Sequence, residues 1–236
     1  MPVVISLHGG GGSARQHRQA SGMDAAADRD GYIVAYPNGS GVLRDRLLTW
    51  NAGNCCSYAQ EHNIDDVGFI AVLIDDLARR AAIDTRRVYV VGHSNGGLWA
   101  RSAIKVLKDS NAPVTVRSLT TLGTPHVGAI PPRFYAGEID LASCMGQAFC
   151  EKTLQGWKDI VAALDKGLSA EDTIKFMSGP DGWNAAQGTA LDGIPVTLLA
   201  GTYFEANGGD PTLWPNDGTV GRYSAFASDV PDSVMP

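Results

Sequence analysis

The chain has 236 residues, which is enough for one sizeable α/β domain or two small ones. Hydrophobic residues make up 44% of it and charged residues 19%, the proportions of an ordinary globular protein. The formal net charge of −6 argues against nucleic acid as the main partner, because phosphate binding needs a basic face. The arginine pairs at 79–80 and 86–87 are interpreted as solvated surface. No apolar run approaches the roughly 20 residues needed to cross a bilayer, so no integral membrane segment is expected.

Apolar, strand-like runs alternate along the chain with helical patterns, which predicts an α/β fold: a mostly parallel sheet with helices on both faces. The expected strands are residues 3–7, 33–36, 88–91, 116–122 and 194–200. The expected helices are residues 15–29, 66–82, 95–108 and 154–164. The second of these has the strongest pattern, because its apolar residues recur at the spacing of one helix face. Gly31 is placed to end the first helix.

The chain is interpreted as a single domain, residues 1–236, with a lid-like insertion at about residues 129–151, where Pro, Gly and Cys are frequent. It opens directly in an apolar run, Pro2 to Leu7, and natural chains seldom begin inside the core of a sheet. We therefore expect the sequence to start partway through a longer parent and to lack the first strands of its fold.

The four cysteines give information about the redox state of the compartment in which the protein acts. Cys144 and Cys150 lie six positions apart, where a local disulfide and two free thiols are equal alternatives. Cys55 and Cys56 are adjacent, so one can bridge elsewhere while the other stays free. Neither pair has metal-ligand spacing with histidine, so no zinc site is expected, and the sequence assigns no residue as a metal ligand. The even number favours an oxidising compartment, and the parent protein is expected to be secreted or periplasmic, although no signal-peptide pattern is present.

Residues 92–96, Gly-His-Ser-Asn-Gly, fit the nucleophile motif G-x-S-x-G. The motif alone is weak, but an apolar strand runs into it and a helical pattern runs out of it, as the turn of a nucleophilic serine requires. Glycines permit so sharp a turn, and the following helix directs its N-terminus at the reaction centre. The alternative is an ordinary Gly-rich turn in which the serine caps the helix. The context favours Ser94 as a nucleophile.

Residues 8–12, His-Gly-Gly-Gly-Gly, directly follow the first expected strand. Acyl transfer builds negative charge on the carbonyl oxygen, so backbone N–H groups must already point at it, and glycines let the backbone approach the substrate. We expect Gly10 and Asn95, the residue after the nucleophile, to supply these two donors as an oxyanion hole. A phosphate-binding loop is the rival, but the run lacks both the Gly-Lys-Ser/Thr ending and the G-x-G-x-x-G pattern.

The acid of a catalytic triad usually follows the serine in the chain, and the histidine follows the acid. Asp217 lies in a tight turn beyond the last expected strand and is the predicted acid, with Asp181, Asp192 and Asp210 as weaker competitors. All five histidines precede Asp217, so the base is missing from its usual place. Three explanations stay open: the chain ends before the histidine, His126 serves as the base from its position just beyond a strand, or the protein is catalytically inactive.

Two sets of motifs resemble known families. The first set is Leu7-His-Gly-Gly10, Tyr36-Pro-Asn-Gly39, Trp50-Asn-Ala-Gly-Asn-Cys-Cys56, Ile64-Asp-Asp-Val-Gly-Phe69 and Val88-Tyr-Val-Val-Gly-His-Ser-Asn-Gly-Gly97. In this order the motifs resemble the polyhydroxybutyrate depolymerase and feruloyl esterase family over residues 2 to about 100. The second set is Leu122-Gly-Thr-Pro-His126 and Asn216-Asp-Gly-Thr-Val-Gly-Arg-Tyr-Ser-Ala225. Those motifs, after about residue 116, resemble bacterial triacylglycerol lipases.

Both resemblances imply the α/β-hydrolase fold. The lipase resemblance implies that Asp217 is the triad acid and that the catalytic histidine lies further on than residue 236. The histidine of the Gly-Thr-Pro-His motif, here His126, is usually not the base in those lipases. Some of them hold a structural calcium, whose ligands the sequence does not identify in this chain. No other cofactor is expected.

Both resemblances also imply hydrolysis of carboxylic esters through an acyl-enzyme on Ser94, with a small-molecule or polymeric ester as the partner. They disagree on the substrate, which is an acylglycerol, a short acyl ester, a hydroxycinnamoyl ester or a polyester. The alternative is an inactive or truncated α/β-hydrolase module that binds a ligand or a partner, since no histidine follows Asp217. The sequence does not set the oligomeric state.

Overall fold

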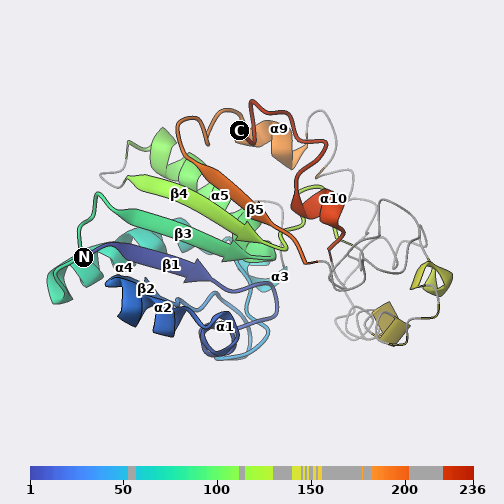
Figure 1. The fold of residues 1–236 in the computed structure, drawn as a ribbon, viewed down its shortest axis with the longest axis horizontal. Helices are drawn as coiled ribbons and strands as arrows, with labels where there is room; N and C mark the ends of the chain where they lie inside the picture. The colour runs from blue at the N-terminus through green and yellow to red at the C-terminus, as the bar shows by residue number, and fades with distance from the viewer. Residues whose placement is uncertain are drawn as a thin grey trace.

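A parallel sheet forms the centre of the molecule (Figure 1). The computed structural model describes residues 1–52, 57–111, 115–129, 140–144, 146, 148, 151–152, 154–155, 177, 182–201 and 220–236. The strands in these ranges are β1 (Val3–Leu7), β2 (Ile33–Ala35), β3 (Val88–His93), β4 (Val116–Leu122) and β5 (Val196–Leu199). They lie in the order β2-β1-β3-β4-β5, and every neighbouring pair is parallel. The predicted α/β fold with a parallel sheet is confirmed.

The strand order reverses between β1 and β3. The chain leaves β1 to one side to form β2, then crosses back to add β3 on the other side of β1. In open parallel sheets, ligands bind at such a switch point, outside the carboxyl ends of the strands. Leu7 and Gly92 are in register near those ends, so the loops that follow them start side by side. Both predicted glycine motifs therefore lie at one place.

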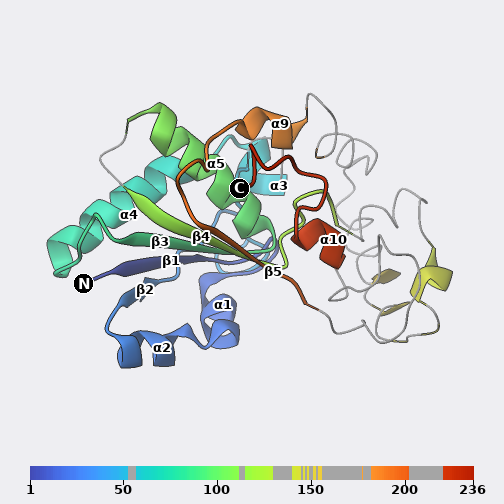
Figure 2. The ribbon, with the colours of Figure 1, turned by 45° about the horizontal axis from the view of Figure 1, so that its top comes forward.

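Helices cover both faces of the sheet (Figure 2). The helices of one face are α1 (Ala14–Ser21) and α2 (Met23–Asp30), and those of the other are α4 (Asp66–Arg80) and α5 (Asn95–Asp109). The expectation of one helix over residues 15–29 is wrong, because the structure has two. Gly22 between them has a φ of 63°, a left-handed conformation that ends α1. Gly31 ends α2 in the same way, as predicted, with a φ of 75°.

Shorter elements lie where the sequence predicted none. They are α3 (Ser57–Glu61), a 3₁₀ turn (Leu141–Cys144), α9 (Trp183–Gln187) and α10 (Arg222–Ala225). Each has only four or five residues, too few for apolar periodicity to show. Residues 156–164 of the predicted helix 154–164 and most of the predicted insertion 129–151 lie outside the described residues. Both stay predictions, as does the single-domain interpretation. No helix in the described part of the chain is long and apolar enough to cross a membrane.

The helices α4 and α5 bury their apolar faces against the same side of the sheet. At the start of α4, the Asp65 side chain accepts a hydrogen bond from the Gly68 N–H at 2.8 Å, which is a typical N-cap. The buried face of α4 includes Ile70 and Ile74, one helical turn apart. In α5, every residue from 95 to 101 is buried. The helix that follows Ser94 is thus part of the core, and packing fixes its start.

Aromatic rings connect the loop after β1 to α5 through the core. The ring centroid of Trp50 lies 4.9 Å from that of His8 and 5.3 Å from that of Trp99. Both tryptophans are almost fully buried. An aromatic side chain buries about 150–250 Å², which at roughly 25 cal/mol per Å² stabilises the fold by about 4–6 kcal/mol. The two tryptophans are therefore a large part of the packing beneath the site.

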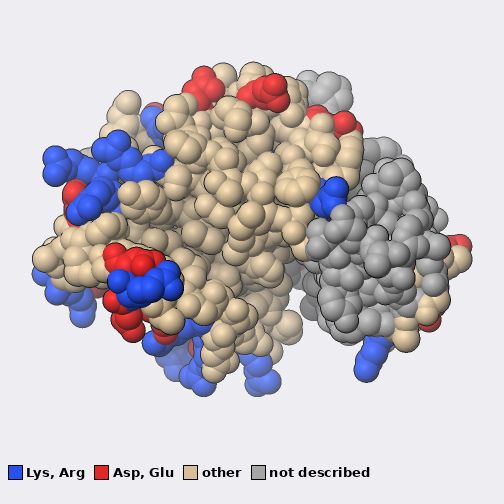
Figure 3. All heavy atoms as spheres, in the orientation of Figure 1, with Lys and Arg blue, Asp and Glu red and all other residues tan. Residues whose placement is uncertain are grey.

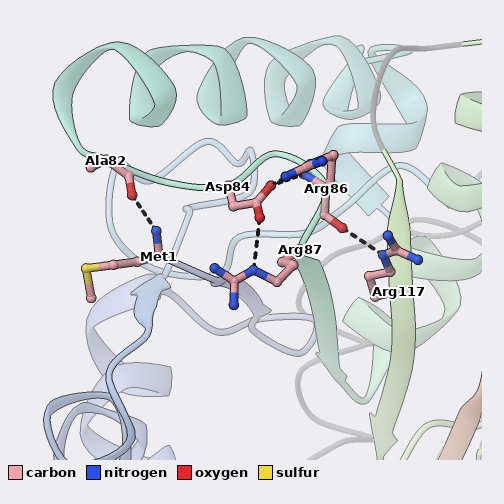
Figure 4. A network of polar contacts seen from close by, with 6 residues as sticks. All are labelled: Met1, Ala82, Asp84, Arg86, Arg87 and Arg117. Carbon is pink, nitrogen blue, oxygen red and sulfur yellow. Dashed lines mark hydrogen bonds and ion pairs between the residues drawn. The ribbon is translucent and has the colours of Figure 1, made fainter.

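A polar network lies at the amino-terminal ends of the strands (Figure 4). The Asp84 carboxylate accepts hydrogen bonds from Arg87 Nε at 3.0 Å and from Arg86 Nε at 3.3 Å. The Arg117 Nε–H donates to the Arg86 carbonyl at 2.7 Å, which ties the loop before β3 to the start of β4. Lys and Arg gather at this end of the molecule, whereas the surface over the middle of the sheet is largely uncharged (Figure 3). The arginines are exposed, in agreement with their interpretation as solvated surface.

Candidate active site

Ser94 lies at the sharp turn between β3 and α5. Its φ of 51° and ψ of −124° are a strained conformation for a residue with a Cβ. The Ser94 N–H donates to the Leu122 carbonyl at 2.9 Å, and the Gly97 N–H donates to the Ser94 carbonyl at 3.0 Å. The side chain of Ser94 is half-buried. Strand, strained serine and helix follow one another as a nucleophile elbow requires.

Close packing around Gly92 and Gly97 explains why the turn is so tight. A Cβ on Gly92 would lie 2.5 Å from Gly97 Cα, and a Cβ on Gly97 would lie 2.0 Å from Thr124 Oγ1. Real Cβ atoms essentially never approach another atom closer than 3.0 Å. The end of β3 therefore passes directly against the first turn of α5, and Thr124, which follows β4, closes the other side of that turn.

The loop after β1 packs against the elbow. A Cβ on Gly9 would lie 3.0 Å from Ser94 Cβ, and a Cβ on Gly10 would lie 3.5 Å from Asn95 Cβ. The structure thus places the two predicted oxyanion donors, Gly10 and Asn95, beside each other and beside the serine. None of the described residues accepts a hydrogen bond from the Gly10 N–H. Asn95 is the first residue of α5, whose N-terminus adds partial positive charge at the same place.

His8 fixes the conformation of the glycine loop. Its buried ring lies between two backbone groups: Nδ1 is 2.7 Å from the Gly9 carbonyl, and Nε2 accepts from the Gly39 N–H at 3.0 Å. A ring protonated on Nδ1 satisfies both contacts. Burial lowers the pKa of His8, so the ring is neutral at pH 7. The His8 carbonyl also accepts from Trp50 Nε1 at 3.0 Å, which attaches the loop to the core.

Two further histidines lie on the α1 side of the elbow. The His17 and His93 rings are stacked with their centroids 6.0 Å apart, and the Tyr36 ring stands edge-on to His17 at 6.1 Å. His17 Nε2 is 2.9 Å from Ser6 Oγ. Burial, together with the neighbouring His93, lowers the pKa of His17 to about 4, so this ring is neutral at pH 7. No described residue forms a hydrogen bond with Ser94 Oγ, so neither ring is bonded to the predicted nucleophile.

His126 is fully buried, and both of its ring nitrogens are occupied. Nδ1 lies 3.1 Å from Arg101 Nη1, and Nε2 lies 3.1 Å from Thr121 Oγ1. Burial, reinforced by the Arg101 charge, holds the pKa of His126 well below its ordinary value. The structure does not bring this predicted base to Ser94. The ring contacts α5 at Arg101, seven residues beyond the serine, which is about 10 Å along the helix axis.

Arg101 is a residue of this region that sequence reasoning missed. The residue is 1% exposed, and its guanidinium lies 4.6 Å from the ring centroid of Trp183 and donates to Asn184 Oδ1 at 2.8 Å. Burial lowers its pKa to about 9. A signal does exist in the sequence. Arg101 is three residues from both Leu98 and Ile104, so helical spacing puts its charge on the buried face of α5.

The structure describes only some of the other predicted residues. Asp217, the predicted acid, lies outside the described residues, as do Asp181 and Asp210. Asp192 is exposed in the turn before β5. Cys144 is disulfide-bonded, while Cys150 lies outside the described residues. Among the side chains that the structure describes, no three metal-ligating groups lie close enough to hold an ion.

A cavity of about 630 Å³ lies away from the elbow, among the N-terminus of α4, α5 and α9. Its walls include Asp66, Lys105 and Trp183. The Asp66 carboxylate accepts from the Asn51 N–H at 2.7 Å, and burial raises the pKa of Asp66 to about 6. None of the predicted site residues that the structure describes lines this cavity.

Proteins with related sequences include two that are named as esterases. Feruloyl esterase B of Piromyces equi is 36% identical over 96 residues, which cover 41% of this chain and 17% of that protein. The bifunctional acetylxylan esterase/xylanase XynS20E of Neocallimastix patriciarum is 26% identical over 111 residues, which cover 47% of this chain and 15% of that protein. The chain thus spans less than a fifth of the length of these two relatives.

Solved structures share the fold of this chain. The Bacillus licheniformis lipase BlEst2 in its propeptide form aligns with a TM-score of 0.56 and 19% identity over 95% of this chain and 43% of that one. Its mature form aligns with a TM-score of 0.52 and 20% identity over 95% of this chain and 78% of that one. The predicted α/β-hydrolase fold is therefore confirmed. The PGAP1-like alpha/beta domain family matches residues 1–152, more than half of the sequence. The chain therefore belongs to the family of PGAP1-like α/β domains, within the α/β-hydrolase superfamily.

Proposed function

We propose that this chain is the core of a hydrolase that cleaves carboxylic esters through an acyl-enzyme on Ser94. The observation that carries the proposal is the strained backbone of Ser94 at the β1–β3 switch point, with the glycine loop packed against it. The sequence relatives named as esterases support the same class of reaction.

In the proposed reaction, Ser94 Oγ attacks the ester carbonyl while its proton passes to a general base. The N–H groups of Gly10 and Asn95 stabilise the oxyanion that develops, and the loss of one such donor costs about 10²–10³ in rate. The tetrahedral intermediate collapses to the acyl-enzyme, and the alcohol leaves with the proton from the base. Water then attacks the acyl-enzyme in the same way and releases the acid.

The general base and its carboxylate stay predictions. His8 and His126 both have their two ring nitrogens occupied, which leaves neither an acceptor for the serine proton. Asp217 keeps its proposed role as the carboxylate that orients the base. Removal of the triad histidine costs about 2 × 10⁶ in kcat in subtilisin, so the source of the base decides whether this chain turns over substrate.

The proposed substrates are carboxylic esters. Hydroxycinnamoyl esters stand first, because a feruloyl esterase is among the sequence relatives, and short acyl esters, acylglycerols and polyesters follow. The disulfide at Cys144 supports action outside the reducing cytosol, in agreement with the expected secretion or export to a periplasm.

The test is covalent labelling of the purified chain with a fluorophosphonate, followed by peptide mass spectrometry. We expect an adduct confined to Ser94. The Ser94→Ala variant should lose the adduct, whereas Ser102→Ala, a half-buried serine on the same helix, should keep it. Hydrolysis of p-nitrophenyl acetate and methyl ferulate by the same proteins then separates short acyl esters from hydroxycinnamoyl esters.

Two outcomes contradict the proposal. A folded chain that takes up no label and cleaves neither ester is an inactive module, and its function lies in binding. A label on another residue that survives in Ser94→Ala places the nucleophile elsewhere.

A further inference from the structure

The buried Arg101–His126 pair takes no part in the proposed reaction, yet it is a costly feature of the core. No carboxylate among the described residues pairs with Arg101, and its Nε and Nη2 atoms have no hydrogen-bond acceptor. Taking a charge out of water without a counter-ion opposes folding. The contacts that Arg101 does make, with His126, Asn184 and the Trp183 ring, therefore need a reason.

The contacts of His126 determine where its proton lies. An arginine can only donate, so the Nδ1 atom 3.1 Å from Arg101 Nη1 must be the bare acceptor. The proton of the neutral ring is then on Nε2, which donates to Thr121 Oγ1 at 3.1 Å. A triad histidine has the opposite arrangement, with its Nδ1–H toward the acid and a bare Nε2 toward the serine. His126 is thus held in the tautomer that cannot accept the proton of Ser94.

The segment that carries His126 connects the elbow to the rest of the fold. Before His126, Thr124 is fully buried against Gly97 in the first turn of α5. At His126 itself, the carbonyl accepts from Asn184 Nδ2 at 2.7 Å. After it, the Val127 N–H donates to Ser224 Oγ at 3.1 Å. The position of Thr124 against the first turn of α5 therefore depends on the orientation of the His126 ring.

We propose that Arg101 and His126 are positioning residues. Arg101 locks His126 in the neutral Nε2–H tautomer, and the locked ring fixes the segment 123–128. Thr124 then sets the first turn of α5, and with it the Asn95 N–H, relative to Ser94. The catalytic part of this inference rests on the proposed function, whereas the lock and its effect on the backbone do not.

The first experiment tests the lock without reference to activity. Nitrogen-15 NMR of the full chain should show His126 with a bare Nδ1 and a protonated Nε2 from pH 5 to pH 8, with no titration. In Arg101→Met, which keeps the apolar stem and removes the guanidinium, this tautomer preference should be lost. The backbone amide signals of Gly96 and Gly97 should shift at the same time. The Ser102→Ala variant, a neighbour on the same helix, should leave all of these signals in place.

The second experiment measures the rate at which Ser94 reacts with the fluorophosphonate. We expect Arg101→Met and His126→Asn to lower the maximal rate by up to about 10²-fold, the effect of a small misplacement of reacting groups. The probe concentration for half-maximal rate and the pH midpoint of the reaction should not change. Arg101→Lys keeps the charge and should recover part of the rate.

Each other result overturns the proposal. If His126 titrates near pH 6.5 or carries its proton on Nδ1, the lock does not exist. If Gly96 and Gly97 do not respond to Arg101→Met, the pair has a merely structural role, and the same conclusion follows if stability falls while the labelling rate holds. A loss of labelling by about 10⁴-fold or more in His126→Asn, together with loss of the pH midpoint, makes His126 the base. If even the unmodified chain takes up no label, the proposed function fails, and the NMR result alone then decides whether the lock exists.

Discussion

Replacement of Gly97 by alanine tests the packing that shapes the elbow. The new Cβ would lie 2.0 Å from Thr124 Oγ1 and 2.9 Å from both Thr124 Cβ and Cγ2. Forcing an extra carbon into a packed core costs about 1–3 kcal/mol and sometimes more. The better helix propensity of alanine offsets about 1 kcal/mol of this. We therefore expect Gly97→Ala to lower the free energy of unfolding by up to about 2 kcal/mol.

The second substitution, Thr124→Ala, tests whether the Thr124 side chain causes the loss of stability in Gly97→Ala. Three Thr124 atoms would clash with a Cβ at position 97, and this substitution removes two of them, Oγ1 and Cγ2. Thr124 Cβ stays in place at 2.9 Å. The double variant should therefore be more stable than the sum of the single changes predicts, by about 1 kcal/mol or more. Gly96→Ala is the matched control, because its Cβ would meet the His8 carbonyl oxygen at 2.6 Å, a backbone atom that Thr124→Ala cannot remove.

The free energies of unfolding are measured by urea unfolding followed by circular dichroism, with one extrapolation for all proteins. The five variants are the three single substitutions and the two double variants that combine Thr124→Ala with Gly97→Ala or with Gly96→Ala. Gly96→Ala and Thr124→Ala should be additive within about 0.5 kcal/mol. If Gly97→Ala is also additive with Thr124→Ala, then Thr124 is not the residue that closes the first turn of α5, and the described geometry of the elbow is wrong.

Three other predictions concern residues around the site and the cavity. His8→Ala should lower the free energy of unfolding by about 1–3 kcal/mol in urea titrations, because it leaves the Gly39 N–H without its acceptor, and an unchanged value would contradict that role. Burial raises the pKa of Asp66 from 3.8 to about 6, so its ionisation opposes folding. The free energy of unfolding relative to Asp66→Asn should fall by about 2 kcal/mol as the pH rises from 4 to 6, and parallel curves for the two proteins would refute this. Burial lowers the pKa of His17 from 6.5 to about 4, so protonation opposes folding: stability relative to His17→Gln should be lost as the pH falls from 6.5 to 4, and a constant difference would show that the ring is not held neutral.

Much of the fold follows from short-range patterns. The five strands were predictable because each is a compact apolar run, and the ends of each run match the structure within two residues. The helix beginning at Asp66 was predictable from its apolar spacing. The break at Gly22 was not, because a glycine inside an Ala-rich, polar segment is compatible with one helix or two. The tertiary position of that segment over the sheet decides between them.

The candidate site divides in the same way. The placement of Gly10, Ser94 and Asn95 follows from local motifs and from the rule that loops after parallel strands meet at one edge. The roles of His8 and Arg101 depend instead on which polar groups become buried together. Such burial is a property of the packed chain, so a pattern within one segment gives little information about it.

The hydrogen bond from the Ser94 N–H to the Leu122 carbonyl has a consequence for how the protein folds during its synthesis. β3 pairs with β1, far upstream, and with β4, downstream, so the strained serine depends on two closures that are distant in sequence. Such non-local pairing is slow to form. On a ribosome, residues 1–94 would emerge with the serine still relaxed, and its reactive geometry would arise only after β4 had left the exit tunnel and joined the sheet.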